Sequence, residues 1–457
     1  MSAIQDSARL GAYVADALAQ AALPGAGVRA ITDTSPVVFD TLVKETAARI
    51  GTAAGRGASA AHATGPQGAA AADDVDKLRV LLYSADLGGG HDAMANAIKG
   101  ELLTRFPGMV DVEVANGLRI GNPFLHRLMR DGYQAQLKYA PGSYGAMYTM
   151  ASNPTFARIN ESVSRMFTAG RLADDIARRD PDVVVSTFPQ LTGTLGHLRA
   201  DGRLKVPAMG VVIDSDPHRQ WVSPLVDDHL VLNPADLPRI AKFGTPDAPI
   251  TGRAIRPPVD PRSFEPYDVA AARAEFGLPQ DQKVLLVSGG SWGLALPEEE
   301  LQRILRDTDL HLAIATGRNE QAFNHLAATF PADRVTPIPF TREMPKLLAA
   351  SDGMLTNSAG MTTMEGFARG RPIVLYRPVP GHGVDGAAAL AEDGLATYAT
   401  TPHEAVDALR RIQAGDDVDL AARVARARSM FDEGEHASDI VIDAARTGSN
   451  RRATAKT

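Results

Sequence analysis

Short apolar runs alternate with stretches of helical periodicity along most of the chain, beginning at Leu78. A first series of runs predicts strands at Leu78–Ser84, Val110–Val114, Val183–Thr187, Ala208–Ile213 and His229–Leu232. A second series predicts strands at Val284–Ser288, His311–Thr316, Arg334–Ile338, Gly353–Thr356, Ile373–Tyr376 and Leu395–Tyr398. Strands that alternate with helices form parallel sheets covered on both faces. The pattern therefore predicts an α/β fold with two doubly wound, Rossmann-like domains facing each other across a cleft.

A proline-rich segment separates the two series. Pro257, Pro258 and Pro261 interrupt the pattern and indicate a hinge. We therefore predict one Rossmann-like domain over residues 78–252 and a second over 253–435. Because ligands bind at the carboxyl ends of the strands in such folds, the candidate site residues are sought there.

The two ends of the sequence lie outside these domains. Residues 1–77 hold two weak helical patterns and then an alanine- and glycine-rich stretch, Gly51 to Ala72, and are interpreted as a helical appendage and flexible linker of unassigned role. Residues 436–457 are expected to give a C-terminal helix, with the segment Gly434–Ala445 packing back across the cleft, and a disordered tail over 448–457.

Composition narrows the functional classes. Of the 457 residues, 44% are hydrophobic and 22% are charged, as in ordinary globular proteins. The formal net charge of −7 gives no reason to expect nucleic-acid binding. Because the chain contains no cysteine, the sequence excludes disulfides, thiolate catalysis and cysteine-ligated zinc. No apolar run approaches the ~20 residues of a membrane span, and the N-terminus lacks the apolar core of a signal peptide, so we expect a cytoplasmic location.

The segment from Leu355 to Gly381 carries the clearest chemical signal, because a strand leads through small residues into a helix. A helix start presents unpaired N–H groups and the positive end of the helix dipole, which together attract anions. Glu365 lies about one and a half turns along this helix, where its carboxylate could accept hydrogen bonds from a ribose. The pattern is typical of a nucleotide-sugar pocket, but it also fits an ordinary helix start in an α/β domain. The N–H groups placed to hold the anion are those of Ala359, Gly360 and Met361, and the hydroxyl groups of Ser358, Thr362 and Thr363 lie beside them.

A glycine-rich turn, SADLGGGH, follows the first predicted strand and ends at His91. Gly89 and Gly90 allow a ligand to approach the backbone closely. The turn is neither a dinucleotide GxGxxG fingerprint with its downstream acid nor a phosphate loop ending in GK[ST]. His91 lies where a general base belongs, at the presumed cleft, although a helix-start histidine can also simply pack or form a hydrogen bond.

Two other segments are candidates for phosphate binding. The first strand of the second series ends in Ser288, Gly289 and Gly290, whose N–H groups could hold phosphate or merely form a tight turn. At the hinge, Arg256 could reach into the cleft and neutralise a diphosphate. A surface arginine beside a proline is an equally good interpretation.

The run DSDPHRQW, from Asp214 to Trp221, follows another predicted strand. Acids and a histidine at a strand's carboxyl end suit acceptor binding or base catalysis. Asp216 and His218 could instead form a metal pair, but two ligands are too few to define a site. The sequence has neither an HExxH motif nor an aspartate cluster that would indicate an essential metal.

Residues 117–170 are rich in aromatic and methionine side chains with basic residues between them. An apolar face edged by basic groups could rest on an anionic membrane surface and admit a lipid. A stripe of this kind is also typical of a buried core.

Taken in order, these segments resemble the two-domain glycosyltransferases of the diacylglycerol glucosyl/galactosyltransferase family. More distantly they resemble the enzyme that adds N-acetylglucosamine to undecaprenyl-linked muramyl peptide. The segments that carry the resemblance are SADLGGGH, DPDVVVSTFP, PITGRAIRPPVD and LTNSAGMTTMEGFARGRPIVLYRPVPG. The resemblance covers about residues 78–435 and implies a GT-B architecture, with the acceptor in the first domain and the donor nucleotide in the second.

The resemblance also implies roles for individual residues. His91 would be the base that deprotonates the acceptor hydroxyl, with Asp214 as the second candidate. Arg256 and the 358–361 turn would hold the diphosphate and Glu365 the ribose. No cofactor and no metal is expected, because a helix dipole would stabilise the departing UDP. The full set of expected donor-binding residues, which includes the pair bordering the uracil (Phe340 and Thr341), is Gly89, Gly90, Arg256, Ser288, Gly289, Gly290, Phe340, Thr341, Ser358, Ala359, Gly360, Met361, Thr362, Glu365 and His382.

One departure from the family bears on the donor sugar. After PVPG the family usually has a Gln-Glu pair and then an Asn that contact the sugar, whereas this chain reads HGVDGA from His382. His382 could replace the glutamine, but Gly383 cannot replace a polar side chain. The leading hypothesis is the inverting transfer of a hexose from a UDP-sugar to a lipid hydroxyl, that of diacylglycerol, at the inner face of the cell membrane. The alternatives are a non-catalytic nucleotide-sugar or lipid-binding protein and a UDP-sugar epimerase.

Overall fold

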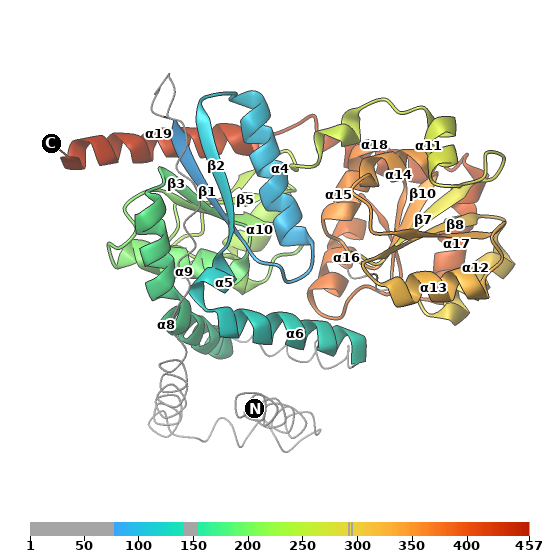
Figure 1. The fold of residues 1–457 in the computed structure, drawn as a ribbon, viewed down its shortest axis with the longest axis horizontal. Helices are drawn as coiled ribbons and strands as arrows, with labels where there is room; N and C mark the ends of the chain where they lie inside the picture. The colour runs from blue at the N-terminus through green and yellow to red at the C-terminus, as the bar shows by residue number, and fades with distance from the viewer. Residues whose placement is uncertain (1–76, 140–153, 291–292, 294–295, 457) are drawn as a thin grey trace, which may run out of the picture. The chain divides into compact units, whose positions relative to one another are not determined.

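The structure, a computed structural model, describes residues 77–139, 154–290, 293 and 296–456. Apart from Lys77, the predicted N-terminal appendage and linker lie outside the described residues. The described chain contains two six-stranded parallel sheets, in the orders β2-β1-β3-β4-β5-β6 and β12-β11-β10-β7-β8-β9 (Figure 1). The α/β fold with two doubly wound parallel sheets is therefore confirmed.

The first sheet follows the predicted strands closely and adds one, β6, which pairs with β5. This short strand lies just after the boundary predicted between residues 252 and 253, and that boundary stays a prediction. The elements of this domain are β1 (Leu78–Ser84), α4 (Gly90–Arg105), β2 (Val110–Asn116), α5 (Gly117–Gly121), α6 (Pro123–Tyr139), α8 (Pro154–Arg179), β3 (Val183–Ser186), α9 (Pro189–Ala200), β4 (Ala208–Val212), η1 (Arg219–Trp221), β5 (Asp228–Val231), α10 (Asp236–Ala241) and β6 (Arg253–Ala254).

The second sheet reproduces all six predicted strands of the second series. Its elements are η2 (Pro261–Phe264), α11 (Val269–Glu275), β7 (Val284–Ser288), α12 (Glu298–Asp307), β8 (His311–Gly317), α13 (Glu320–Thr329), β9 (Val335–Pro339), α14 (Met344–Ala350), β10 (Gly353–Thr356), α15 (Met361–Ala368), β11 (Ile373–Tyr376), α16 (His382–Glu392), β12 (Thr397–Ala399), α17 (Pro402–Ala414) and α18 (Val418–Ser429).

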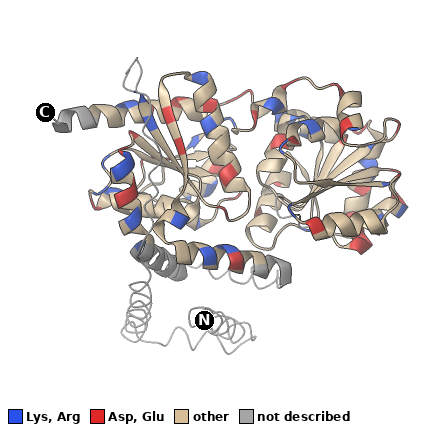
Figure 2. Cartoon of the chain, in the orientation of Figure 1, with Lys and Arg blue, Asp and Glu red and all other residues tan. Residues whose placement is uncertain are grey.

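The strands are buried on both faces, as parallel sheets require. In β1, Val80 and Leu82 pack into the cluster that includes α4, whereas Leu81 and Tyr83 pack with α5, α8 and α9 on the other face. Each such side chain contributes roughly 1.5–3 kcal/mol by leaving water. Acidic and basic residues are instead interspersed on the outer helices, while the strands are largely uncharged (Figure 2).

The C-terminal helix α19 (Ala437–Lys456) returns to the first domain, where it packs on β1, β3 and α4 (Figure 1). The return of this segment, which the sequence predicted, is confirmed. The expected disordered tail is not observed over 448–456, because the helix continues to Lys456. The helix approaches the first sheet so closely that a Cβ on Gly448 would lie 1.8 Å from the carbonyl oxygen of Asp182. Glycine is needed at that position.

Candidate active site

His91 lies in the first turn of α4, directly after the glycine-rich turn. Gly88 in this turn has a positive φ of 84°, which a residue with a side chain rarely adopts. The Nδ1 of His91 is 2.6 Å from the carbonyl oxygen of Thr187. Because a carbonyl can only accept, Nδ1 carries the proton, and in the neutral ring the lone pair is on Nε2. That tautomer is the one a general base needs.

Aromatic rings surround this histidine. Phe188 meets it edge-on with ring centroids 4.9 Å apart, and Trp221 lies 5.9 Å away. Burial lowers the pKa of His91, and the negative charge of Asp214 partly opposes that change. The ring is therefore neutral near pH 7 and able to take a proton. Asp214 itself accepts a 2.7 Å hydrogen bond from Nε1 of Trp221, which fixes the carboxylate near the base.

The loop after β4 contains a strained residue next to this carboxylate. Asp216 has a φ of 53° and precedes a proline, which costs free energy, and residues strained in this way cluster at functional sites. Burial is the main reason that the pKa of His218 falls to about 4, so this ring is neutral too. Among the residues that the structure describes, no group of three or more His, Asp or Glu side chains is arranged to hold a metal ion.

His382, at the start of α16 in the second domain, comes near this group. Its charge contributes to lowering the pKa of both His91 and His218, as a nearby cationic group would. Further along α16, a Cβ on Gly386 would lie 3.2 Å from the carbonyl oxygen of Ser215. The structure thus brings together the predicted base, its acidic neighbour and a predicted donor residue from opposite domains.

The two predicted phosphate-binding turns also meet. In the register of β7 and β10, Ser288 pairs with Thr356, so the turns after these strands are neighbours. Ser288, Gly289, Thr356 and Asn357 line a small cavity between them. This places the 288–290 turn beside the 357–361 turn at the carboxyl ends of the strands of the second sheet.

The turn before α15 is ordered by its own hydroxyl groups. The Oγ of Ser358 accepts a 3.2 Å hydrogen bond from the Gly360 amide, and Thr363 donates a 2.6 Å hydrogen bond to the Ser358 carbonyl. The first amides of α15, at Met361 and Thr362, have no partner within the helix by its geometry. They present the positive end of the dipole at this edge.

Glu365 lies within α15, and burial raises its pKa to about 7. Asp260 adds to this rise and Arg262 opposes it. Asp260 is held by Arg262 at 2.7 Å, so the pair stands beside the glutamate at the start of η2. A carboxyl that titrates near neutral pH can accept or donate a hydrogen bond to a diol.

The predicted uracil border lies after β9. Phe340 is 44% exposed, and the guanidinium of Arg318 stacks on its ring at 4.3 Å. The hydroxyl of Thr341 accepts a hydrogen bond from the Glu343 amide, so it bonds within its own loop. The exposed ring and cation form a flat surface suitable for a planar base. Sequence reasoning missed Arg318, whose position is set by the neighbouring strand end of β8.

Arg256 is held at the crossing between the domains. Its Nε donates to the Gly434 carbonyl at 3.0 Å, and one of its terminal nitrogens lies 3.3 Å from Nε2 of His436. The structure therefore gives this guanidinium partners in the segment that leads to α19. Its assignment to the diphosphate stays a prediction.

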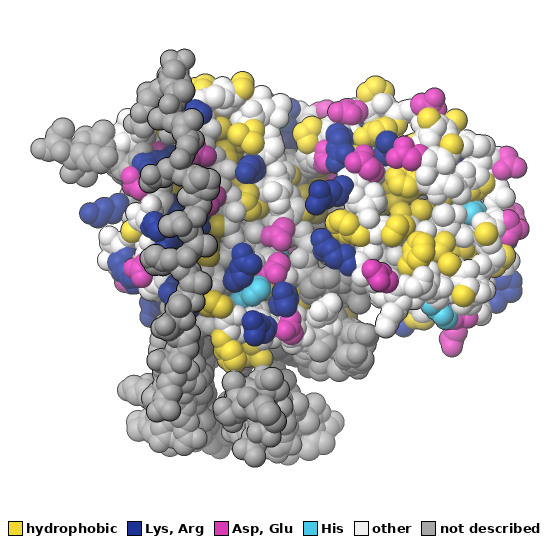
Figure 3. All heavy atoms as spheres, in the orientation of Figure 1, with side chains coloured by type: hydrophobic (Ala, Val, Ile, Leu, Met, Phe, Trp, Pro, Cys, Tyr) yellow, Lys and Arg dark blue, Asp and Glu magenta, His cyan; other side chains and the backbone are white. Residues whose placement is uncertain are grey.

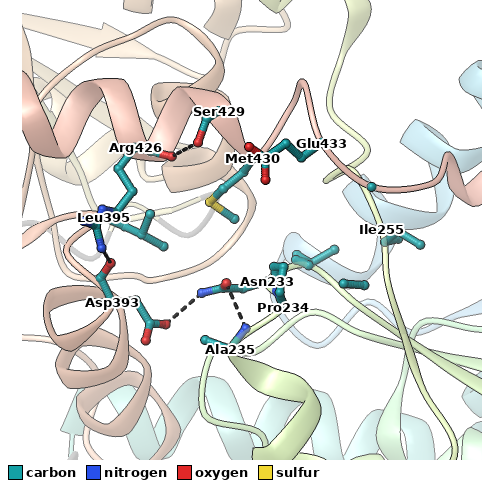
Figure 4. Close-up of a pocket in the computed structure, with 13 residues that line it drawn as sticks. Asn233, Pro234, Ala235, Ile255, Asp393, Leu395, Arg426, Ser429, Met430 and Glu433 are labelled. Atoms are coloured by element: carbon teal, nitrogen blue, oxygen red, sulfur yellow. Dashed lines mark hydrogen bonds between the residues drawn. The ribbon is translucent and has the colours of Figure 1, made fainter.

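A cavity of about 420 Å³ lies between the domains, and none of the predicted site residues lines it (Figure 4). Asp393, at the end of α16, points into it and accepts a 2.7 Å hydrogen bond from Asn233 (Figure 4). The same carboxylate receives two hydrogen bonds from Arg239, at 2.9 and 3.0 Å. This group ties the two domains together beside the cavity.

Comparison with known proteins agrees with this architecture. Residues 91–251 match the family model of monogalactosyldiacylglycerol (MGDG) synthase. The processive diacylglycerol beta-glucosyltransferase of Bacillus pumilus is 26% identical over 66% of this chain and 78% of its own length. The enzyme of the same name from Bacillus subtilis is 24% identical over 74% of this chain and 88% of its own length.

Solved structures show the same fold at lower identity. The Phytolacca americana UGT2 complexed with UDP-2fluoro-glucose and pterostilbene has a TM-score of 0.51 and 13% identity, covering 81% of this chain and all of its own. Os79 from O. sativa in complex with UDP has a TM-score of 0.52 and 15% identity with the same coverage of this chain and all of its own. The described chain therefore has the GT-B fold. Its relatives are the diacylglycerol glucosyl- and galactosyltransferases, and the resemblance inferred from its motifs is confirmed.

Proposed function

We propose that the protein is an inverting glycosyltransferase that moves a hexose from a UDP-sugar to the free hydroxyl of diacylglycerol. The observation that carries the proposal is the approach of α16, which begins at His382, to the loop beside His91, where a Cβ on Gly386 would lie 3.2 Å from the carbonyl oxygen of Ser215. The MGDG synthase match and the diacylglycerol glucosyltransferase relatives support this choice of acceptor.

In this reaction His91 acts on the acceptor. The hydroxyl oxygen attacks the anomeric carbon from the face opposite UDP, while the bond from that carbon to the phosphate oxygen breaks. The configuration inverts, and the hydroxyl proton passes to Nε2 of His91, whose Nδ1–H stays on the Thr187 carbonyl. The charge of Asp214 stabilises the imidazolium that forms.

The donor lies along the edge of the second sheet. The start of α15 stabilises the negative charge that develops on UDP, Glu365 binds the ribose and Phe340 stacks against the uracil. This arrangement is the basis for proposing that transfer needs no metal. Full activity in the presence of a chelator is the expected result.

The first domain offers a surface for the lipid. On α6, Phe124 is 51% exposed and Leu128 is 43% exposed, and Arg127 is exposed between them. Hydrophobic and basic side chains lie side by side over this helix (Figure 3). Leu118, by contrast, is buried in the core, and the tyrosines and methionines predicted over 140–153 lie outside the described residues.

No helix in the described part of the chain is both long and apolar enough to span a bilayer. We therefore propose that the protein works at the cytoplasmic face of the membrane, with α6 resting on anionic lipid headgroups.

A donor screen tests the proposal. Full-length protein is incubated with vesicles of diacylglycerol and anionic lipid and offered UDP-glucose, UDP-galactose or UDP-N-acetylglucosamine, and both UDP release and glycolipid are measured. We expect glycolipid from one donor, with inverted anomeric configuration. UDP binding without product from any donor would favour the non-catalytic binding protein instead.

A further inference from the structure

Arg377 lies at the donor edge of the second sheet, and the sequence patterns give no hint of its role. It follows β11 directly, and β11 pairs with β10, which leads into the 357–361 turn. The Val379 amide donates a 3.3 Å hydrogen bond to the Asn357 carbonyl, so the two turns are joined. Arg377 is therefore a neighbour of the turn proposed to bind the diphosphate.

The backbone of Arg377 is strained. Its φ is 50°, in the left-handed region, and a proline follows it. Residues other than glycine seldom adopt this conformation, and those that do so cluster at ligand-binding sites.

A buried carboxylate holds the guanidinium in place. Glu300 on α12 is only 9% exposed and accepts a 3.1 Å hydrogen bond from Arg377. A second cation, Arg303, lies 3.8 Å from the same carboxylate. Two positive charges on one negative charge leave a surplus of one. The Arg377 side chain is 52% exposed, so its guanidinium has nitrogen atoms accessible to a further anion.

We propose that Arg377 is a further donor-binding residue, whose guanidinium neutralises the diphosphate of the UDP-sugar. The inference rests on the proposed function, since it takes the donor to be a UDP-sugar bound at this edge. It supplies a cation there, whereas Arg256 is held by Gly434 and His436 at the interdomain crossing. Glu300 acts through Arg377 by orienting it and is a positioning residue.

Calorimetric titration with UDP and with uridine tests the assignment, using the full-length chain. For Arg377→Gln we expect roughly tenfold weaker UDP binding, equivalent to about 1.4 kcal/mol, because a charge-assisted hydrogen bond to the diphosphate is lost. Uridine lacks phosphate, so its binding should change little. Arg377→Lys keeps the charge and should recover part of the affinity. Arg303→Gln is the matched control, since it removes a cation from the same carboxylate and should leave UDP binding within about twofold.

The outcomes separate the two proposals. Equal UDP affinity in the parent and a folded Arg377→Gln variant would overturn the assignment of Arg377 and leave the proposed function standing. An equal loss in Arg303→Gln would also overturn it, because the effect would then be general electrostatics around Glu300. A parent protein that binds no UDP would overturn the proposed function itself, and with it this inference. A loss for UDP that is shared by uridine would indicate a damaged pocket, which a lowered unfolding midpoint of Arg377→Gln would confirm, and would count against a specific role in phosphate binding.

Discussion

Replacing Glu365 by glutamine should stabilise the folded protein above neutral pH and change how UDP binding depends on pH. Burial holds the pKa of this carboxyl at about 7, against an ordinary value of 4.5. Since a tenfold change in proton affinity corresponds to about 1.4 kcal/mol, ionising Glu365 costs about 3.5 kcal/mol more in the folded protein than in the unfolded chain. Glutamine has nearly the same shape and no charge, so the variant avoids this cost.

The sign follows from proton binding. The folded state keeps the Glu365 proton to a higher pH than the unfolded chain does, so the parent protein loses stability as the pH rises from about 4.5 to about 7. Below this window the two proteins should be equally stable, because the carboxyl is protonated in both states. The difference in unfolding free energy should grow through the window and level off above about pH 8.

Urea unfolding of the full-length chain at a series of pH values measures this difference. The control is Glu265→Gln, which changes an exposed glutamate whose backbone carbonyl accepts a hydrogen bond from Arg369, just after α15, and should not reproduce the effect. A difference for Glu365→Gln that is the same at every pH would refute the reasoning. So would a variant that is less stable than the parent at pH 8.

The same substitution tests the ribose assignment. An ionised carboxylate accepts hydrogen bonds from a diol more strongly than a protonated one, so parent UDP affinity should rise relative to the variant as the pH passes about 7. The titration of UDP itself is common to both proteins and cancels in the comparison. Parallel affinity curves would show that Glu365 does not contact the ribose.

Three other perturbations probe separate parts of the molecule. His91→Ala should lower glycolipid formation by roughly 10²–10⁴-fold and leave UDP binding intact, and normal turnover in the variant would exclude this base. In the parent protein, the rate of glycolipid formation should fall on the acid side only below the ordinary histidine pKa of 6.5, because burial lowers the pKa of His91. Gly448→Ala should lower the unfolding midpoint markedly, because the added Cβ would lie 1.8 Å from a backbone oxygen. The control Gly170→Ala should not lower it, because a Cβ there would have no atom within 4 Å. Equal midpoints for the two variants would contradict the packing of α19. Phe124→Ser combined with Leu128→Ser should weaken sedimentation with anionic vesicles without affecting UDP binding, and unchanged sedimentation would remove α6 from the membrane surface.

Much of the fold could be predicted because its strands are fully buried and read as unbroken apolar runs. The two-residue strand β6 (Arg253–Ala254) was not predicted, because so short an element shows no hydrophobic periodicity in the sequence. The helical conformation of residues 448–456 was not predicted for another reason. Its sequence is polar and rich in small residues, and it continues a helix whose earlier residues pack in the core of the first domain, which no local pattern reports.

The candidate site shows a similar division. Turns at strand ends, such as the one before His91 and the one at Ser358, could be located because glycine and small residues mark them in the sequence. The nearness of His382 to His91 could not, since it depends on how two domains face each other. Nor could the left-handed backbone of Arg377, because an arginine before a proline gives no local signal for that conformation.

The return of α19 to the first domain has a consequence for engineering. Its buried residues Ile440, Val441 and Ile442 belong to the core around β1 and α4, although they follow the whole second domain in the chain. A chimaera that exchanges acceptor domains between two relatives at a single junction near the hinge would pair one parent's helix with the other parent's sheet. Recombination of these enzymes therefore calls for two crossovers, one between β6 and η2 and one after α18, so that the C-terminal helix travels with the sheet it covers.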